Sequence, residues 1–539
     1  MSQIIAPEHG SNFAEEIGRQ NKTHPFMKCR ITQKQAERAL KRTFDRLLAK
    51  HFISAFDRST TGHRAVGVLQ GMLAMSVGRR TLTNCQVVRG FDQKDWSANC
   101  RTFSVGKWRT VDIYEGVFNG ARPLLGLTGP VVLGIDDTGI PKSGSEFESA
   151  GWIHNPLVPK YVRPAIQWGV PVLHAALLIQ GEVVHRPTAI TVAFEPIERE
   201  NRKKRRSKPK STSTQDPSLQ VELPKRRGRP TKEEAARRKA ERDTIIRDEE
   251  QAQTSSAVSD VKLKATELAV RVIWRVRKWM DSAGMGERTL LVVGDSSYTN
   301  GTVMMCLPHH TVYLGRTRPD SQLQAMGSAT KEGRIKYGPS LPTPKEMAVD
   351  RLLDVNLGKF HYAGALRDLK FLELGPVFRK NSTRSMRLKL LVLEPVPYGK
   401  GETRGYNRRA YLLSTDLDMP AADLIAAYLM RWELEVIHRI WKTDLGIGDP
   451  QTKKHRIRAA MAAYYALLQV ANLLTFGEER SEGFGPLSKW AANRRAYFER
   501  CQVAEGKPKP KYRATPTEIK NLIVRANSPR GTKVLPLIA

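Results

Sequence analysis

Three acidic residues stand at positions in the sequence that suit the binding of a divalent metal ion. Asp137 follows an apolar run at 131–135, Asp295 follows a second run at 290–294, and Glu435 lies later in a helical pattern. Short continuous apolar runs of this kind predict strands that are buried on both faces. Carboxylate oxygens are the ligands that Mg²⁺ and Mn²⁺ prefer. For either aspartate alone, however, a role in a turn or a helix N-cap is more frequent.

Glu435 shares one face of a predicted helix at about 421–444 with three other polar residues. At about 100° per residue, four side chains fall within a sector of roughly 60°: Tyr428, Arg431, Glu435 and Lys442. The apolar residues lie opposite: Leu429, Leu434, Val436, Ile437, Ile440 and Trp441. Two interpretations remain open on spacing alone. Glu435 binds a metal while its neighbours hold phosphates, or Arg431 and Glu435 form an ordinary i,i+4 ion pair.

Several neighbouring residues are weaker candidates. Alternation along a strand places Asp136 on the side opposite Asp137, so Asp136 is not predicted to bind the metal. Trp432 could stack on a base or pack in the core, and His438 is expected to fill a packing or surface position. Cys306 and the histidines after it have the residue types of zinc ligands but no second ligand pair at suitable spacing.

The charge of the chain indicates its partner. The 539 residues include 88 Lys and Arg against 54 Asp and Glu, a formal net charge of +34. A surface of this sign attracts polyanions, so nucleic acid is predicted ahead of a ribosomal or membrane-surface role. A hydrophobic content of 40% indicates a globular protein rather than a disordered or fibrous one. No P-loop, Gly-rich dinucleotide motif or nucleophile elbow supports a nucleotide cofactor or serine hydrolysis.

The cysteines and the apolar segments predict a cytoplasmic protein. Five cysteines, widely spaced and without a CxxC pair, indicate reduced thiols rather than a disulfide framework. No secretory signal is visible at the N-terminus. The apolar stretch 459–474 is shorter than the ~20 residues that a bilayer requires, so we expect a buried core helix and no membrane association.

Hydrophobic periodicity predicts an α/β protein with six regions. Residues 1–125 form a helical N-terminal DNA-binding domain, with a plain structural cap as the alternative. Residues 126–195 and 256–300 carry strands at 131–135, 170–179, 183–194 and 290–294 and a helix at 256–282. Residues 301–420 form a β-rich insertion with strands around 312–314, 388–393 and 410–413. Residues 421–480 contain the polar helix and the apolar helix, and 481–539 form a basic tail.

Residues 196–255 form a basic insertion that cannot bury a core and is predicted to be flexible. It contains Arg227-Gly228-Arg229-Pro230. This tetrapeptide resembles an AT-hook, in which Arg227 and Arg229 would lie in the minor groove of A·T-rich DNA. The alternative, which the short length of the match favours slightly, is a non-specific polybasic linker that contacts phosphates.

The helix and the two aspartates together resemble one known family. The residues Tyr428, Arg431, Glu435 and Lys442 match, in type and in all three gaps, the signature of insertion-sequence-four-like DDE transposases of bacteria. Asp137-Thr138 after the first apolar run and Asp295 after the later one are also similar to that family, in the same order. The resemblance covers roughly residues 65–475. The basic insertion and the segment 143–152 depart from the family pattern.

The resemblance implies an RNase H-like catalytic core, a mixed sheet flanked by helices, with a β-rich insertion and a helical N-terminal domain. Asp137, Asp295 and Glu435 would bind two Mg²⁺ or Mn²⁺ ions, and Tyr428, Arg431 and Lys442 would contact phosphates near the element's end. The expected function is cut-and-paste transposition, which requires cleavage at terminal inverted repeats and strand transfer into target DNA. A homodimer in a bacterial, nucleoid-associated cytoplasmic setting would be implied. The alternatives are a catalytically inactive DNA-binding regulator and a structure-specific nuclease of the same fold.

Overall fold

The computed structural model describes residues 33–74, 79–88, 97–142, 144, 146–154, 165–181, 184–198, 263–329, 335–349, 355–362, 365–379, 386–395, 397–398, 405–406, 409–443 and 445–476. Every structural statement below concerns these residues. Arg227 and Arg229, almost all of the basic insertion and the whole of the basic tail lie outside them. The predictions for those segments therefore stay predictions.

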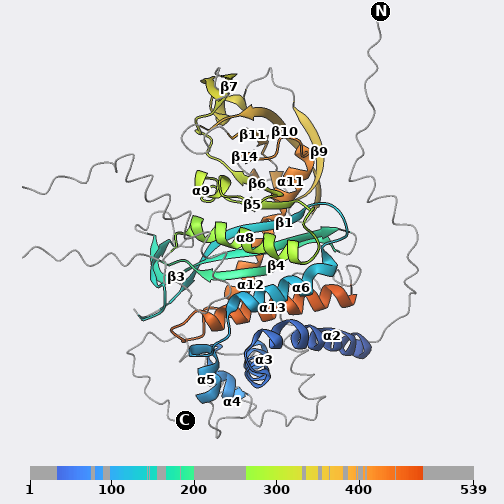
Figure 1. The fold of residues 1–539 in the computed structure, drawn as a ribbon, viewed down its shortest axis with the longest axis vertical. Helices are drawn as coiled ribbons and strands as arrows, with labels where there is room; N and C mark the ends of the chain where they lie inside the picture. Colours follow the sequence, from blue (N-terminus) through green and yellow to red (C-terminus); the bar gives the residue numbers. More distant parts are fainter. Residues whose placement is uncertain are drawn as a thin grey trace, which may run out of the picture.

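One large mixed sheet runs through the described part of the molecule (Figure 1). Its first strands are β1 (Val131–Pro141), β2 (Gly151–His154), β3 (Ile166–Gly181), β4 (Val184–Pro196), β5 (Leu290–Gly294) and β6 (Thr311–Arg316). The strand order is β2-β3-β1-β5-β6-β14-β11-β10-β9, and β4 also pairs with β3. Strands β1, β5 and β6 are parallel, whereas β3 is antiparallel to β1. The predicted α/β class, with a mixed sheet between helices, is confirmed at this level.

The predicted β-rich region continues the same sheet. Its members are β9 (Asn356–Tyr362), β10 (Ala365–Val377), β11 (Leu388–Leu393) and β14 (Ala410–Ser414), and β14 pairs with β6. Two separate hairpins accompany them: β7 (Gln324–Ala329) with β8 (Ile335–Ser340), and β12 (Pro397–Tyr398) with β13 (Gly405–Tyr406). The strands predicted around 312–314, 388–393 and 410–413 are confirmed. Hydrogen bonds between β6 and β14 connect this region directly to the first strands.

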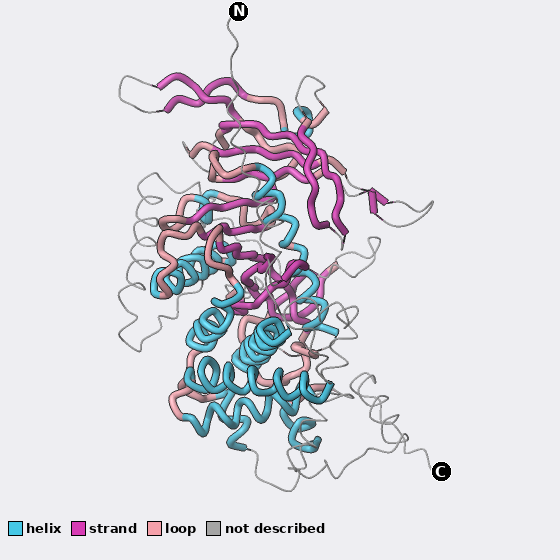
Figure 2. The backbone as a smooth tube through the Cα atoms, turned by 90° about the vertical axis from the view of Figure 1, so that its right-hand side faces the viewer, coloured by secondary structure: helices cyan, strands magenta, loops and turns pink. Residues whose placement is uncertain are grey.

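Helices gather on the faces of the sheet and at one end of the molecule (Figure 2). The N-terminal ones are α2 (Gln33–Leu47), η1 (Leu48–Phe52), η2 (Ile53–Ala55), α3 (Ser59–Ala74), α4 (Leu82–Val88), α5 (Ser97–Ser104), α6 (Thr110–Ala121) and η3 (Arg122–Leu124). The later ones are α8 (Ala265–Ser282), α9 (Gly301–Met304), α10 (Pro344–Met347), α11 (Ala421–Met430), α12 (Trp432–Thr443) and α13 (Arg456–Phe476). Helix α12 packs on β1, β3 and β4, while α13 lies between β4 and the N-terminal helices α2 and α6. The helical character of the N-terminal region is confirmed.

Helix α13 is longer than the sequence suggested. It has 21 residues, because helical periodicity extends beyond the apolar stretch at 459–474 to Arg456 and Phe476. Among the described helices it alone is long and apolar enough to cross a membrane, and 94% of that apolar window is buried inside the protein. The expectation of a buried core helix is therefore confirmed, although its estimated length was wrong.

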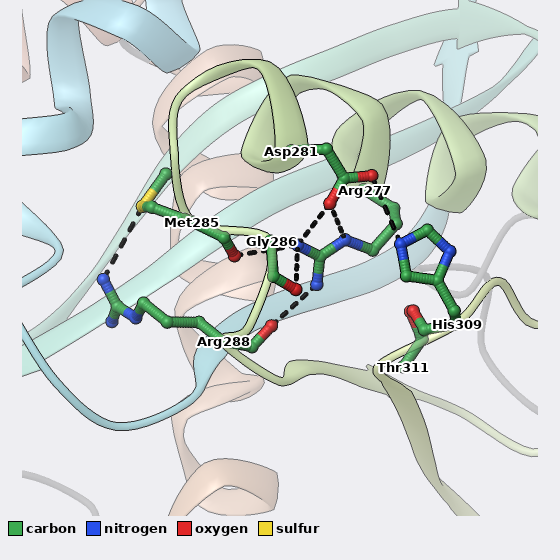
Figure 3. A network of polar contacts seen from close by, with 7 residues as sticks. All are labelled: Arg277, Asp281, Met285, Gly286, Arg288, His309 and Thr311. Atoms are coloured by element: carbon green, nitrogen blue, oxygen red, sulfur yellow. Dashed lines mark hydrogen bonds and ion pairs between the residues drawn. The ribbon is translucent and has the colours of Figure 1, made fainter.

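Two arginines bind the backbone around the turn that follows helix α8, and Figure 3 shows the contacts of Arg277. Arg277 is fully buried, pairs with Asp281 one turn later, and donates to the backbone carbonyls of Met285, Gly286 and Arg288. The Arg288 side chain in turn donates to the carbonyls of Leu125, Gly126, Thr128 and Gly129 before β1. These bonds satisfy backbone carbonyls in the segments that lead into β1 and β5. They also set where β5 enters the sheet beside β1.

Candidate active site

The first pair of acids lies inside strand β1 and not at its end. The apolar run at 131–135 predicted a short strand, but β1 continues through Asp136 and Asp137 to Pro141. The reason is tertiary: β3 forms an unbroken antiparallel ladder with residues 132–141. Asp295, in contrast, follows directly after β5, as predicted.

The predicted long helix is divided at Arg431. Helix α11 ends at Met430 and α12 begins at Trp432. The Arg431 amide donates to the carbonyl of Tyr428, and its carbonyl accepts from Leu434, so the chain tightens to i,i+3 bonds there. Arg431 keeps right-handed helical dihedral angles, and the polar face therefore passes through the break.

The side chain of Arg431 joins two acids from different elements. Its Nη1 donates to Oδ2 of Asp136 at 3.0 Å, and its Nη2 donates to Oε1 of Glu435 at 3.0 Å. The side chains of Arg431 and Asp136 are 15% and 14% exposed, whereas that of Glu435 is 39% exposed. The ion-pair interpretation of the i,i+4 spacing is confirmed, whereas metal binding by Glu435 stays a prediction. The Arg431–Glu435 ion pair exists, and it also contacts the acidic strand.

Asp136 faces the signature helix, which corrects the expectation that it lies apart from Glu435. In the β1–β3 ladder, Asp136 is directly opposite His174. Residues directly opposite each other share a face of the sheet. The His174 ring bonds His438 of α12, so this face is the one that α12 covers. Alternation then directs Asp137 to the other side, where it is exposed.

The three aspartates are electrostatically coupled. Burial raises the pKa of Asp136 to about 7; Arg431 opposes this rise, and Asp295 adds to it. Although Asp137 is exposed, desolvation by the surrounding protein raises the pKa of its carboxyl, and Asp295 raises it further. Asp295 accepts bonds from the amide and hydroxyl of Ser297, which holds the turn after β5. Asp295 therefore lies close to both neighbouring acids of β1.

The remaining signature residues surround this group. Tyr428 is half-buried, and its ring centroid is 6.0 Å from the Arg431 guanidinium. Lys442 is exposed; partial desolvation lowers its pKa, and Asp136 opposes that effect. Trp432 is 49% exposed, so it is available at the surface beside Arg431 and is not part of the core. Exposure along the predicted face is therefore uneven, from 15% for the side chain of Arg431 to 39% for that of Glu435, with Lys442 exposed.

Behind α12 lies a buried histidine pair that the sequence did not reveal. His174 Nδ1 and His438 Nε2 are 2.9 Å apart, and His174 Nε2 is 3.2 Å from the Thr191 hydroxyl. Burial lowers the pKa of His438 to about 3, and that of His174 is lowered as well, so both rings are neutral. His438 was expected in a packing or surface position, and its burial selects packing. No local pattern marks His174, because its partner comes from a segment far along the chain.

The site contains carboxylates that suit a divalent cation, and it contains Arg431 and Lys442, which suit an anion such as phosphate. Within the described ranges, no three His, Cys, Asp or Glu side chains converge closely enough to form a metal group. The guanidinium of Arg431 stands between Asp136 and Glu435 instead. The oxygen-rich donor set of Asp295, Glu435 and the β1 acids has the chemistry that Mg²⁺ and Mn²⁺ prefer. Arg431 would have to leave at least one acid for an ion to bind both.

No protein-family model matches this sequence, and no curated protein matches it significantly.

Proposed function

We propose that this protein is a DDE transposase with an RNase H-like core, which cuts DNA at the ends of an element and joins them to target DNA. The observation that carries the proposal is the meeting of β1, the end of β5 and helix α12. Arg431 links Asp136 of β1 to Glu435 of α12 at 3.0 Å on each side. The signature residues Tyr428 and Lys442 accompany them, and the chain has a net charge of +34.

Asp295, Glu435 and one acid of β1 would hold Mg²⁺ or Mn²⁺ in this proposal. The bound ions would activate the attacking oxygen and neutralise charge at the phosphodiester. The protein's own contribution is to hold the acids in place and to bind the DNA strand. Arg431 and Lys442 offer charged donors to phosphate oxygens, and Tyr428 offers a hydroxyl. When a phosphate binds the Arg431 guanidinium, that guanidinium releases Asp136 and Glu435.

The sharpest test compares two glutamates on α12. Glu435→Gln removes the charge from the proposed ligand, and Glu433→Gln makes the same change two residues away. With Mg²⁺ and labelled element ends, we expect Glu435→Gln to lose nicking by more than about 100-fold, beyond the usual effect of an outer-shell partner. Glu433→Gln should remain close to wild type, and both variants should bind the DNA. Equal nicking by the two variants would remove Glu435 from the mechanism.

The two acids of β1 require a test of their own. The resemblance assigns the metal to Asp137, whereas the contact with Arg431 favours Asp136. Asp136→Asn and Asp137→Asn should therefore be compared for nicking and for Mn²⁺ affinity. The larger loss identifies the ligand, and equal small losses in both would exclude a role for this strand.

The same assay separates the alternative functions. A regulator that has lost its chemistry would bind element ends without metal-dependent nicking by the wild-type protein. A nuclease of the same fold would nick DNA but would not transfer the strand. The presence of all three acids disfavours the inactive regulator, whereas strand transfer distinguishes the transposase from the nuclease.

A further inference from the structure

The turn after β5 contains a buried tyrosine whose hydroxyl has no partner. Tyr298 is 1% exposed, and its hydroxyl is among the buried polar atoms of the described residues that make no hydrogen bond. Burying a hydroxyl without a bond costs about 1–3 kcal/mol. A group retained at this cost needs an explanation.

The position of Tyr298 supplies one. It lies three residues after Asp295, in a turn closed by a bond from the Thr299 amide to the Asp295 carbonyl. Burial raises the pKa of Tyr298, and Asp137, Asp136 and Asp295 are all close enough to raise it further. The phenol therefore stays protonated, as a hydrogen-bond donor within electrostatic range of three carboxylates.

In this structure two of those acceptors are already engaged. Asp136 accepts from Arg431 and from the Asp137 amide, and Asp295 accepts from Ser297. A carboxylate that binds a metal gives up some of these bonds and is then oriented by donors in the outer shell. The Tyr298 hydroxyl is a donor of that kind, and it makes no hydrogen bond in this structure.

We infer that Tyr298 is a positioning residue whose hydroxyl donates to one of these three aspartates when a divalent cation is bound. The inference rests on the proposed function, since it requires a metal at this site. Tyr298 is too deeply buried to reach DNA, so it acts through the carboxylate and not on the substrate.

The test is Tyr298→Phe in the full chain, which removes only the hydroxyl. Mn²⁺ affinity, measured by electron paramagnetic resonance, should fall about 10-fold, and nicking of element ends should fall with it. The free energy of unfolding in urea with a chelator should stay the same or rise, because the lost hydroxyl has no partner in the metal-free protein.

Tyr114→Phe is the matched control. The Tyr114 hydroxyl is also buried, but it donates to the Ala459 carbonyl at 3.0 Å. Its loss should cost about 1 kcal/mol of stability and leave Mn²⁺ affinity unchanged. The two variants are thus expected to show opposite patterns.

Wild-type Mn²⁺ affinity in Tyr298→Phe would overturn the inference while leaving the proposed function intact. A stability loss equal to that of Tyr114→Phe would also overturn it, because the hydroxyl would then already be bonded without metal. Wild-type protein that neither binds Mn²⁺ nor nicks DNA would refute the proposed function, and the inference with it.

Discussion

Arg277 and Arg431 are both held between elements of the fold, but their partners differ in kind. Arg277 is 1% exposed and gives most of its bonds to backbone carbonyls of the turn between α8 and β5 (Figure 3). Arg431 is 15% exposed and gives its bonds to two carboxylates, Asp136 and Glu435. Backbone carbonyls in a turn serve only the fold, whereas a carboxylate can also release an arginine and bind a metal ion.

The difference gives a way to test which arginine serves the fold and which serves the proposed function. A guanidinium whose bonds end on backbone groups completes the fold, and its loss leaves those groups without partners. A guanidinium that bridges two acids keeps these charged groups together until another cation or a phosphate replaces one contact. Four predictions test this distinction.

The largest expected effect belongs to Arg277. Arg277→Met leaves the carbonyls of Gly286 and Arg288 without this donor and removes the buried ion pair with Asp281. The free energy of unfolding should fall by about 3–5 kcal/mol. Urea denaturation measures this loss. Nicking per folded molecule should not change, and a loss of nicking greater than the loss of folded protein would contradict the structural assignment.

Arg431→Met should reduce nicking more than it reduces stability. We expect nicking to fall about 10- to 100-fold, with a smaller loss of stability than in Arg277→Met, because Asp136 can accept a proton when its partner is gone. Arg439→Met, an exposed change on the same helix, is the control. Equal nicking by Arg431→Met and Arg439→Met would show that Arg431 has no special role in the reaction.

The effect of pH on stability should differ between Arg431→Met and Arg277→Met. Burial raises the folded-state pKa of Asp136 to about 7 from 3.8, so its ionisation lowers stability as pH rises through this range. Arg431 opposes that loss only once the carboxyl is charged. The cost of Arg431→Met should therefore be greater at pH 8 than at pH 5.

The corresponding cost of Arg277→Met should change much less between these pH values, because carbonyls do not titrate. Urea denaturation of both variants at the two pH values measures the difference. A cost for Arg431→Met that is the same at both values would show that Asp136 does not ionise in this range.

The smallest effect is expected at Arg288. Its carbonyl partners lie partly at the surface, so water can replace the guanidinium after Arg288→Met. The free energy of unfolding should fall by about 1 kcal/mol, well below the effect at Arg277. If Arg288→Met lost as much stability as Arg277→Met, the burial of the arginine would not determine how much it stabilises the fold.

The sequence predicted the parts of the site that depend on local pattern. The apolar run at 290–294 gave β5 with its observed bounds, and Asp295 follows it as expected. The buried side of α12 also agrees with its periodicity, since Leu434, Ile437, Ile440 and Trp441 are all buried. These features depend on the period of a strand or a helix, which a single segment contains.

Other features could not be predicted, because they depend on pairing between distant segments. β1 extends past Asp137 only because β3 pairs with it, and neither strand β2 nor the break at Arg431 was predicted. Trp432 was equally compatible with core packing and exposure until its helix was placed. Neither the β1–β3 ladder nor the contact between Arg431 and Asp136 has a local signal.

The sequence by itself determined which residue types stand in the signature and that the two neighbouring acids of β1 face opposite sides. Only the tertiary structure decided which of those sides the helix covers. Alternation fixes the relative direction of successive side chains, but the covered face depends on the register with β3 and on where α12 packs. For that reason Asp136, set aside on sequence alone, is the acid that contacts Arg431 beside Glu435.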